Sequence, residues 1–153
     1  MTSTEPSPEP AGPDSALCEA LATEHGVIYG YGMVSAYSSP QDNALVSAAI
    51  HQHRARRDRV VAILTDRSVT APVAAAGYRL PMPLNGPGAA ARLAVRMEND
   101  AATAWRVVAE QADDAADREL AVTALGESAV LAARWNRALD NRPITTAFPG
   151  GSE

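Results

Sequence analysis

The chain has 153 residues, a length typical of one compact domain. Its formal net charge of −5 argues against a nucleic-acid-binding protein, which would carry a basic face to neutralise phosphates. The single cysteine, Cys18, excludes an internal disulfide and fits a reducing compartment. We find no signal peptide and no run of about 18 apolar residues, and therefore expect a cytoplasmic protein that does not associate with a membrane.

The composition and the first part of the chain indicate helices. Hydrophobic residues make up 46% of the sequence and aromatic residues only 5%, so we expect an all-α protein with a core of Ala, Leu and Val. Residues 1–13 are polar and rich in proline, which predicts a disordered tail. A helix is predicted over residues 14–37, because apolar side chains recur on one face at Leu17, Leu21 and Ile28.

Glycines and prolines suggest how the next segments are arranged. The first predicted helix contains three glycines, which we interpret as points where a neighbouring helix approaches closely: Gly26, Gly30 and Gly32. Ser39 and Pro40 are typical of the first positions of a helix, so a second helix is predicted from there to about Leu64. Only a few residues connect these two helices, which predicts that they are antiparallel neighbours.

The segment from residue 65 to about 87 is interrupted repeatedly by proline and glycine and has no helical periodicity. In extended form it can span the full length of a helix. A third helix is predicted over residues 88–112 and a fourth from Asp114 or Asp117 to about residue 140, with one continuous helix over 88–140 as the alternative. Residues 141–153 are predicted to form a flexible tail. Two hairpins joined by one long crossover predict a ferritin-like four-helix bundle over residues 14–140.

Several ionisable residues fall on or near the apolar faces of these helices. Glu24 lies close to the apolar face of the first helix, and His53 and Arg57 lie within that of the second. Glu98 and Glu127 lie at the edges of the apolar faces of the third and fourth helices. A buried charge is costly unless it is paired or binds a metal ion, so these five residues are the candidate functional group.

Di-iron proteins of the ferritin-like class take a Glu-x-x-His motif from each of two helices, and this chain has no such motif. Ile50 occupies the expected Glu position before His53, and Val130 occupies the expected His position after Glu127. The remaining candidate ligands could hold one metal ion, for which iron or manganese suits three carboxylates and one imidazole: Glu24, His53, Glu98 and Glu127.

The alternative interpretation of the same residues needs no cofactor. Basic side chains of the second helix, Arg54, Arg57 and His53, could pair with Glu24 and Glu98 in the interior. A guanidinium binds carboxylates through two parallel hydrogen bonds and can neutralise them as a metal ion would. We favour this interpretation, because two motif positions are missing.

Three segments resemble an uncharacterised ferritin-like family from actinobacteria. They are Thr23–Gly32 (TEHGVIYGYG), His53–Asp58 (HRARRD) and Ala76–Pro81 (AGYRLP). The similarity extends over most of residues 14–140. It implies a ferritin-like bundle, dimeric in that family, and it implies no activity.

The favoured hypothesis is therefore a non-catalytic ferritin-like protein that acts by association, as a homodimer, with a degenerate di-iron site. The first alternative is an iron- or manganese-dependent oxidase, or an iron-handling protein, that uses the four candidate ligands. The second is a small-ligand carrier with a pocket between the second and third helices, under the loop at residues 78–83.

Overall fold

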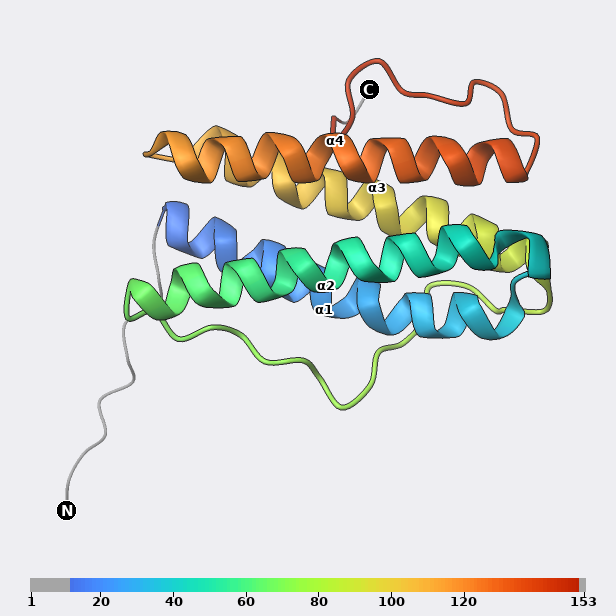
Figure 1. Ribbon diagram of the computed structural model, residues 1–153, viewed down its shortest axis with the longest axis horizontal. Coiled ribbons are helices and arrows are strands. Elements are labelled where there is room, and N and C mark those ends of the chain that lie inside the picture. The colour runs from blue at the N-terminus through green and yellow to red at the C-terminus, as the bar shows by residue number, and fades with distance from the viewer. Residues whose placement is uncertain (1–11, 152–153) are drawn as a thin grey trace.

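The computed structural model describes residues 12–151, and over these residues all regular structure is helical (Figure 1). This confirms the all-α fold class and the prediction of four helices. The predicted N-terminal tail, residues 1–13, lies outside the described residues except for Gly12 and Pro13. A short 3₁₀ turn, η1, precedes the second helix, and the full set of elements is α1 (Pro13–Tyr37), η1 (Pro40–Asp42), α2 (Asn43–Asp66), α3 (Pro87–Gln111) and α4 (Ala115–Ala138).

The third and fourth helices are separate, so the alternative of one continuous helix is wrong. Asp114 is the N-cap of α4, and its side chain accepts a hydrogen bond of 2.8 Å from the backbone N–H of Asp117. The start of the second helix differs from the prediction. Pro40 belongs to η1, and the hydroxyl of Ser39 donates to the Asp42 carboxylate instead of capping a helix.

The four helices pack side by side as two hairpins (Figure 1). Helix α1 packs against α2 and α3, and α3 packs most extensively against α4. Of the four pairs of neighbouring helices, α2 and α4 pack least extensively, so the bundle has one loose seam. Helices α2 and α3 occupy diagonal positions. Across residues 12–151, no helix is both long and apolar enough to cross a membrane.

The crossover between α2 and α3 follows the bundle from one end to the other, as its length predicts (Figure 1). It is attached to α1. The imidazole Nε2 of His25 lies 3.1 Å from the carbonyl oxygen of Pro72, and the rings of Tyr29 and Tyr78 pack with centroids 5.3 Å apart. A Cβ on Gly26 would lie 3.6 Å from the Tyr78 ring, so this glycine faces the crossover and not a helix.

The other two glycines of α1, Gly30 and Gly32, differ in their surroundings. A Cβ on Gly30 would lie only 2.1 Å from the sulfur of Met97, which confirms the predicted close approach, here by a side chain of α3. A Cβ on Gly32 would meet no atom within 4 Å, so the prediction is wrong at that position.

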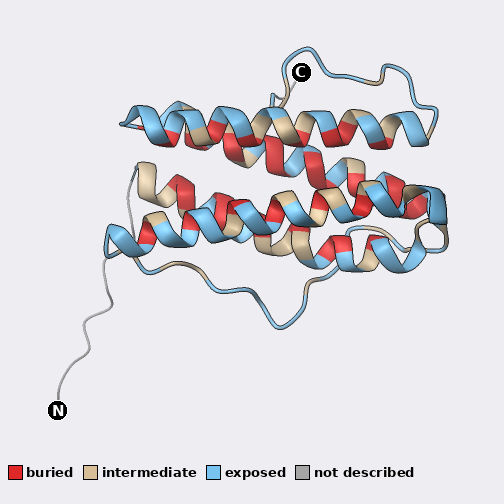
Figure 2. Ribbon diagram, in the orientation of Figure 1, coloured by how far each residue is buried: buried red, intermediate tan, exposed pale blue. Residues whose placement is uncertain are grey.

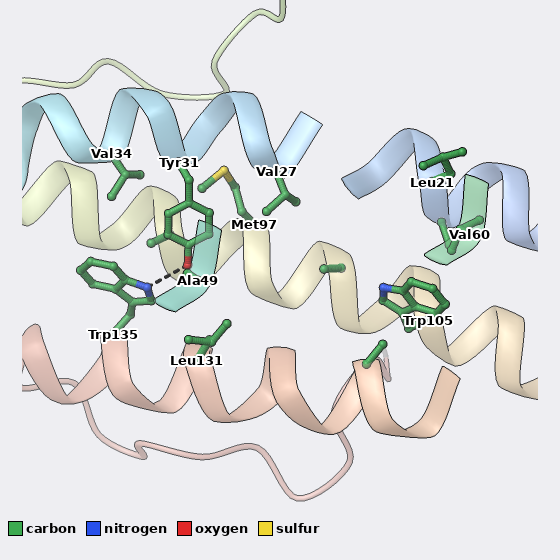
Figure 3. Packing of buried hydrophobic residues seen from close by; sticks show 14 of the residues in the cluster. Leu21, Val27, Tyr31, Val34, Ala49, Val60, Met97, Trp105, Leu131 and Trp135 are labelled. Atoms are coloured by element: carbon green, nitrogen blue, oxygen red, sulfur yellow. Dashed lines mark hydrogen bonds between the residues drawn. The ribbon is translucent and has the colours of Figure 1, made fainter. Parts of the chain in front are cut away.

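The core lies between the helices, where the buried faces meet (Figure 2). Alanine supplies many of the buried positions of α3 and α4, which lets these two helices pack closely. The largest buried side chains fill the remaining space: Trp105, Trp135, Tyr31, Leu17, Leu21, Leu64, Leu93 and Leu131. Figure 3 shows Trp105, Trp135 and Tyr31 among them. Helix α2 has a regular buried face, and two of its six members are not apolar: Val46, Ala49, His53, Arg56, Val60 and Leu64.

Candidate functional site

Four ionisable side chains meet in the interior of the bundle. Glu24 comes from α1, His53 and Arg56 from α2, and Glu98 from α3. We refer to these four residues as the central cluster. Arg56 is 5% exposed and the other three are fully buried, so their charges are removed from water. Such charges must compensate one another if the fold is to be stable.

His53 lies between two carboxylates and contacts both. Its Nδ1 is 2.5 Å from Oε2 of Glu24, and its Nε2 is 3.0 Å from Oε1 of Glu98. Burial by itself lowers the pKa of His53, but the hydrogen bonds to Glu24 and Glu98 outweigh it and raise the pKa from 6.5 to about 9. At neutral pH the ring is therefore an imidazolium that donates both N–H groups, one to each carboxylate.

Arg56 closes the loose seam between α2 and α4. Its Nη1 donates to the hydroxyl of Ser128 at 2.8 Å and to Oε1 of Glu24 at 3.5 Å. Its Nε and Nη2 donate to Oε2 of Glu127 at 3.2 and 3.0 Å. The Glu127 side chain is 41% exposed, so it marks the surface end of this ion-pair network. The central cluster thus has two cations for two buried carboxylates, and Glu127 adds a third carboxylate at the rim.

Three aromatic side chains hold the carboxylates in position. The indole N–H of Trp105 donates to Oε1 of Glu24 at 2.7 Å, and the hydroxyl of Tyr31 donates to Oε1 of Glu98 at 2.5 Å. The indole N–H of Trp135 donates to the Tyr31 hydroxyl at 2.9 Å (Figure 3). Burial and the nearby Glu98 raise the pKa of Tyr31 well above its usual value, so this phenol stays protonated and remains a donor.

One oxygen of Glu98 has no hydrogen-bond partner. Tyr31 and His53 both donate to Oε1, which leaves the buried Oε2 unpaired. An unsatisfied buried acceptor costs free energy, so this atom is the one place in the central cluster where a cation or a water molecule would be stabilising.

The sequence is similar to proteins of unknown function. Residues 16–153 match the family described as "Domain of unknown function (DUF4439)". The chain belongs to the DUF4439 family. It is 62% identical to a solved structure, "a conserved hypothetical protein, rv2844, from Mycobacterium tuberculosis", with a TM-score of 0.82. The match covers 83% of this chain and 96% of that one. A comparison of this sequence with curated proteins gave no match.

In this DUF4439 chain the structure brings together three of the four predicted metal ligands, Glu24, His53 and Glu98. Glu127 is separate, because its carboxylate is bound to Arg56 at the rim. Within residues 12–151, no group of three or more His, Cys, Asp or Glu side chains is arranged to hold a metal ion. In the geometry observed here, the imidazole nitrogens face carboxylates and leave no lone pair free for a metal.

The prediction that Arg57 neutralises the buried carboxylates is wrong. Its guanidinium is 32% exposed and pairs with the neighbouring Asp58 at 2.8 Å, and Arg54 is exposed. Arg56 pairs with Glu24 in its place, and His53 pairs with Glu98. On α4, Leu131 and Trp135 of the predicted apolar face are buried, and Val130, which occupies the motif position where a metal-binding His would stand, is 51% exposed.

Sequence reasoning missed four residues of this site in the DUF4439 chain, although the signal for Arg56 was present. The buried positions of α2 follow a repeat of three and four residues, and Arg56 falls on it, three residues after His53 and four before Val60. No local signal identifies the others, because they meet the carboxylates only through tertiary packing: Tyr31, Trp105 and Ser128.

The arrangement of the helices does not favour the predicted pocket between the second and third helices, under the loop at residues 78–83. Helices α2 and α3 are diagonal, and the Tyr78 ring of the crossover packs directly on α1 at Tyr29 and Gly26. A cavity does exist elsewhere, between α3, α4 and the segment that follows α4.

Proposed function

We propose that this protein is a ferritin-like scaffold that acts by association and has an ion-paired centre in place of a di-iron site. The connectivity supports the ferritin-like assignment, since two hairpins joined by one long crossover are characteristic of that class of bundle. The position of the central cluster also supports it. Glu24, His53 and Glu98 come from three different helices and project into the middle of the bundle, as the ligands of a di-iron protein do.

The observation that carries this proposal is the place of the two cations. The imidazolium of His53 lies between Glu24 and Glu98, and the guanidinium of Arg56 bridges Glu24 to Glu127. Both carboxylates that would hold iron already have a positive charge beside them at neutral pH. A di-iron centre needs two metal ions, and the second would have to displace Arg56 from its hydrogen bond to Ser128.

The test is elemental analysis of freshly purified protein without an affinity tag, combined with thermal unfolding after addition of Fe²⁺ or Mn²⁺ under anaerobic conditions. We expect metal far below one atom per chain and no rise in Tm. About one iron or manganese per chain that disappears in Glu24→Gln would reject the proposal. Glu110→Gln is the matched control, because Glu110 is an exposed residue of α3 that pairs with Arg106.

A second candidate function, a mononuclear iron or manganese site, is favoured by one observation: the unpaired buried Oε2 of Glu98. Two carboxylates and one imidazole are a suitable donor set for these metals. His53 would first have to release a proton, so metal affinity would rise with pH. If this candidate is correct, added Mn²⁺ raises the Tm of the wild type more at pH 8.5 than at pH 6.5, and Glu98→Gln abolishes the effect.

For the association itself, we propose a homodimer that buries the loose α2–α4 seam. Two grooves lie along this face, on either side of Arg56. The groove at one end is lined by two arginines, Arg134 and Arg137, against one aspartate. The groove at the other end contains three aspartates against two arginines, and its Asp66 is exposed. A two-fold axis perpendicular to the helices would place each basic end against the acidic end of the other copy.

Light scattering after size-exclusion chromatography tests this arrangement. We expect a wild-type dimer, a shift towards monomer in Arg137→Glu, and recovery of the dimer when Asp66→Arg is added to it, because the swap restores opposite charges across the two-fold axis. Arg92→Glu, an exposed substitution on α3, serves as the control and should remain dimeric. A monomeric wild type, or a double variant no more dimeric than Arg137→Glu, would exclude this interface.

A further inference from the structure

A partly enclosed cavity of about 160 Å³ lies between α3, α4 and the segment that follows α4. That segment turns back at the end of α4 and runs along the outside of the helix (Figure 1). Three of the α4 residues that line the cavity are alanines, Ala129, Ala132 and Ala133, which leave the space open beside Val130 and Asn136. No member of the central cluster lines it, so it is separate from the ion-pair network.

The segment that covers the cavity is held by specific contacts. The side-chain amide of Asn136 donates to the carbonyl oxygen of Ile144 at 3.1 Å, and its Oδ1 accepts a hydrogen bond of 3.1 Å from Asn141. At the other end of the cover, Gly150 has a φ of 76°. A Cβ there would lie 2.7 Å from the carbonyl oxygen of Ala102, so only glycine allows the cover to lie this close to α3.

The chemistry of the lining selects the ligand. None of the ten lining residues is charged. The walls are apolar, at Val130, Ile144 and Pro149 among others, and the polar groups there are neutral amides and hydroxyls. A charged ligand would lose part of its hydration without gaining a partner of opposite charge, whereas a neutral one loses little.

The size of the cavity sets the size of the ligand, because an apolar protein cavity of roughly 150 Å³ is large enough to bind benzene. We propose that this cavity binds a small uncharged molecule, of the size of one six-membered ring, that carries a single hydroxyl or amide group. The ring or short chain fills the space beside Ala133, and the polar group meets the hydroxyls of Thr145 and Thr146 or the Asn99 amide. This site is independent of the function proposed above, since it uses neither the ion-pair network nor the α2–α4 seam.

Phenol is a suitable probe, and benzoate, which has the same ring with a negative charge, is the matched comparison. Each is titrated into the full-length protein at pH 7 and followed by amide chemical shifts. We expect saturable shifts with phenol at residues 129–136 and 144–149, with a dissociation constant of about 1 mM or tighter. We expect benzoate to bind at least ten times more weakly. No saturable shift with phenol up to its solubility limit, or equal binding of benzoate, would overturn the proposal.

A variant that fills the cavity gives the second test. Ala133→Leu places extra methyl groups in the space and should weaken phenol binding at least tenfold. Ala115→Leu makes the same substitution at the exposed start of α4 and should leave binding unchanged. Ala129→Leu provides an independent filling variant if Ala133→Leu does not fold. Phenol binding that persists in a folded filling variant, or shifts that map outside the lining, would show that the cavity is not the binding site.

Discussion

Replacement of Arg56 by leucine tests whether this side chain neutralises the buried carboxylates. Arg56 is 5% exposed, and its guanidinium donates to Ser128, Glu24 and Glu127. Leucine fills much of the same space but leaves the negative charge of Glu24 partly uncompensated. Removal of one member of a buried ion-pair network typically costs about 3–5 kcal/mol. The contact with Glu127 adds little to this, because a carboxylate that is 41% exposed is well solvated.

The neighbouring arginine provides the control. Arg57 pairs with Asp58 at the surface, so Arg57→Leu should change the free energy of unfolding by less than about 0.5 kcal/mol. Arg56→Lys keeps the charge but loses the planar set of donors, and it should fall between the two.

The assay is equilibrium unfolding in urea, followed by the fluorescence of Trp105 and Trp135. Both indoles are fully buried and both take part in the hydrogen-bond network, so they report its loss. The slope of the unfolding free energy against urea concentration should stay the same in all three variants. A loss below about 1 kcal/mol in Arg56→Leu, or an equal loss in Arg57→Leu, would refute the assignment of Arg56 to the buried network.

Two further predictions concern pH and helix packing. The pKa of His53 is raised from 6.5 to about 9, so protonated His53 stabilises the fold fully below about pH 6.5 and this stabilisation is lost as the pH rises through 9. The free energy of unfolding should therefore fall by about 3 kcal/mol in total between pH 6 and 9.5. This fall should be absent in His53→Gln. Gly32→Ala should raise Tm, since alanine gains up to about 1 kcal/mol of helix propensity in open space. Gly30→Ala must push aside the flexible thioether end of Met97 and should be less stable than Gly32→Ala by about 1 kcal/mol. Equal Tm values for the two glycine variants would contradict the packing described for Met97.

The helices were predictable because their signals are local. Helices α1 and α3 have a proline in the first turn, and α4 has an aspartate N-cap. Together with the recurring apolar residues, these local signals predict the helix bounds to within a few residues. The crossover was predictable from its prolines and its length. The segment after α4 was harder to predict, because it packs against α3 and α4 through tertiary contacts with Ala102 and Asn136.

The candidate site was predictable only in part. Glu24 and His53 fall on apolar faces of their helices, where a charge is conspicuous. Arg56 and Arg57 are consecutive residues, so their side chains differ by about 100° in direction around the helix axis. The apolar residues of this helix are scattered, and the direction of its buried face is uncertain by a comparable angle when it is inferred from sequence. The pairing with Ser128 and Trp105 could not be predicted, because it depends on how α2 meets helices distant in sequence.

The central cluster stabilises the fold less than its hydrogen bonds suggest. Two cations and two carboxylates lose their hydration on burial, and their mutual attraction largely offsets that loss without a great surplus. Removal of one partner is costly because it leaves the others unpaired, whereas replacement of the whole group by well-packed apolar residues of similar volume can be neutral or stabilising. Its contribution therefore lies in specificity: His53 reaches both Glu24 and Glu98 only when α1, α2 and α3 are in this register, and Arg56 then fixes where α4 closes the bundle. An apolar core would tolerate a shift of one helix along another, but this group of charges does not.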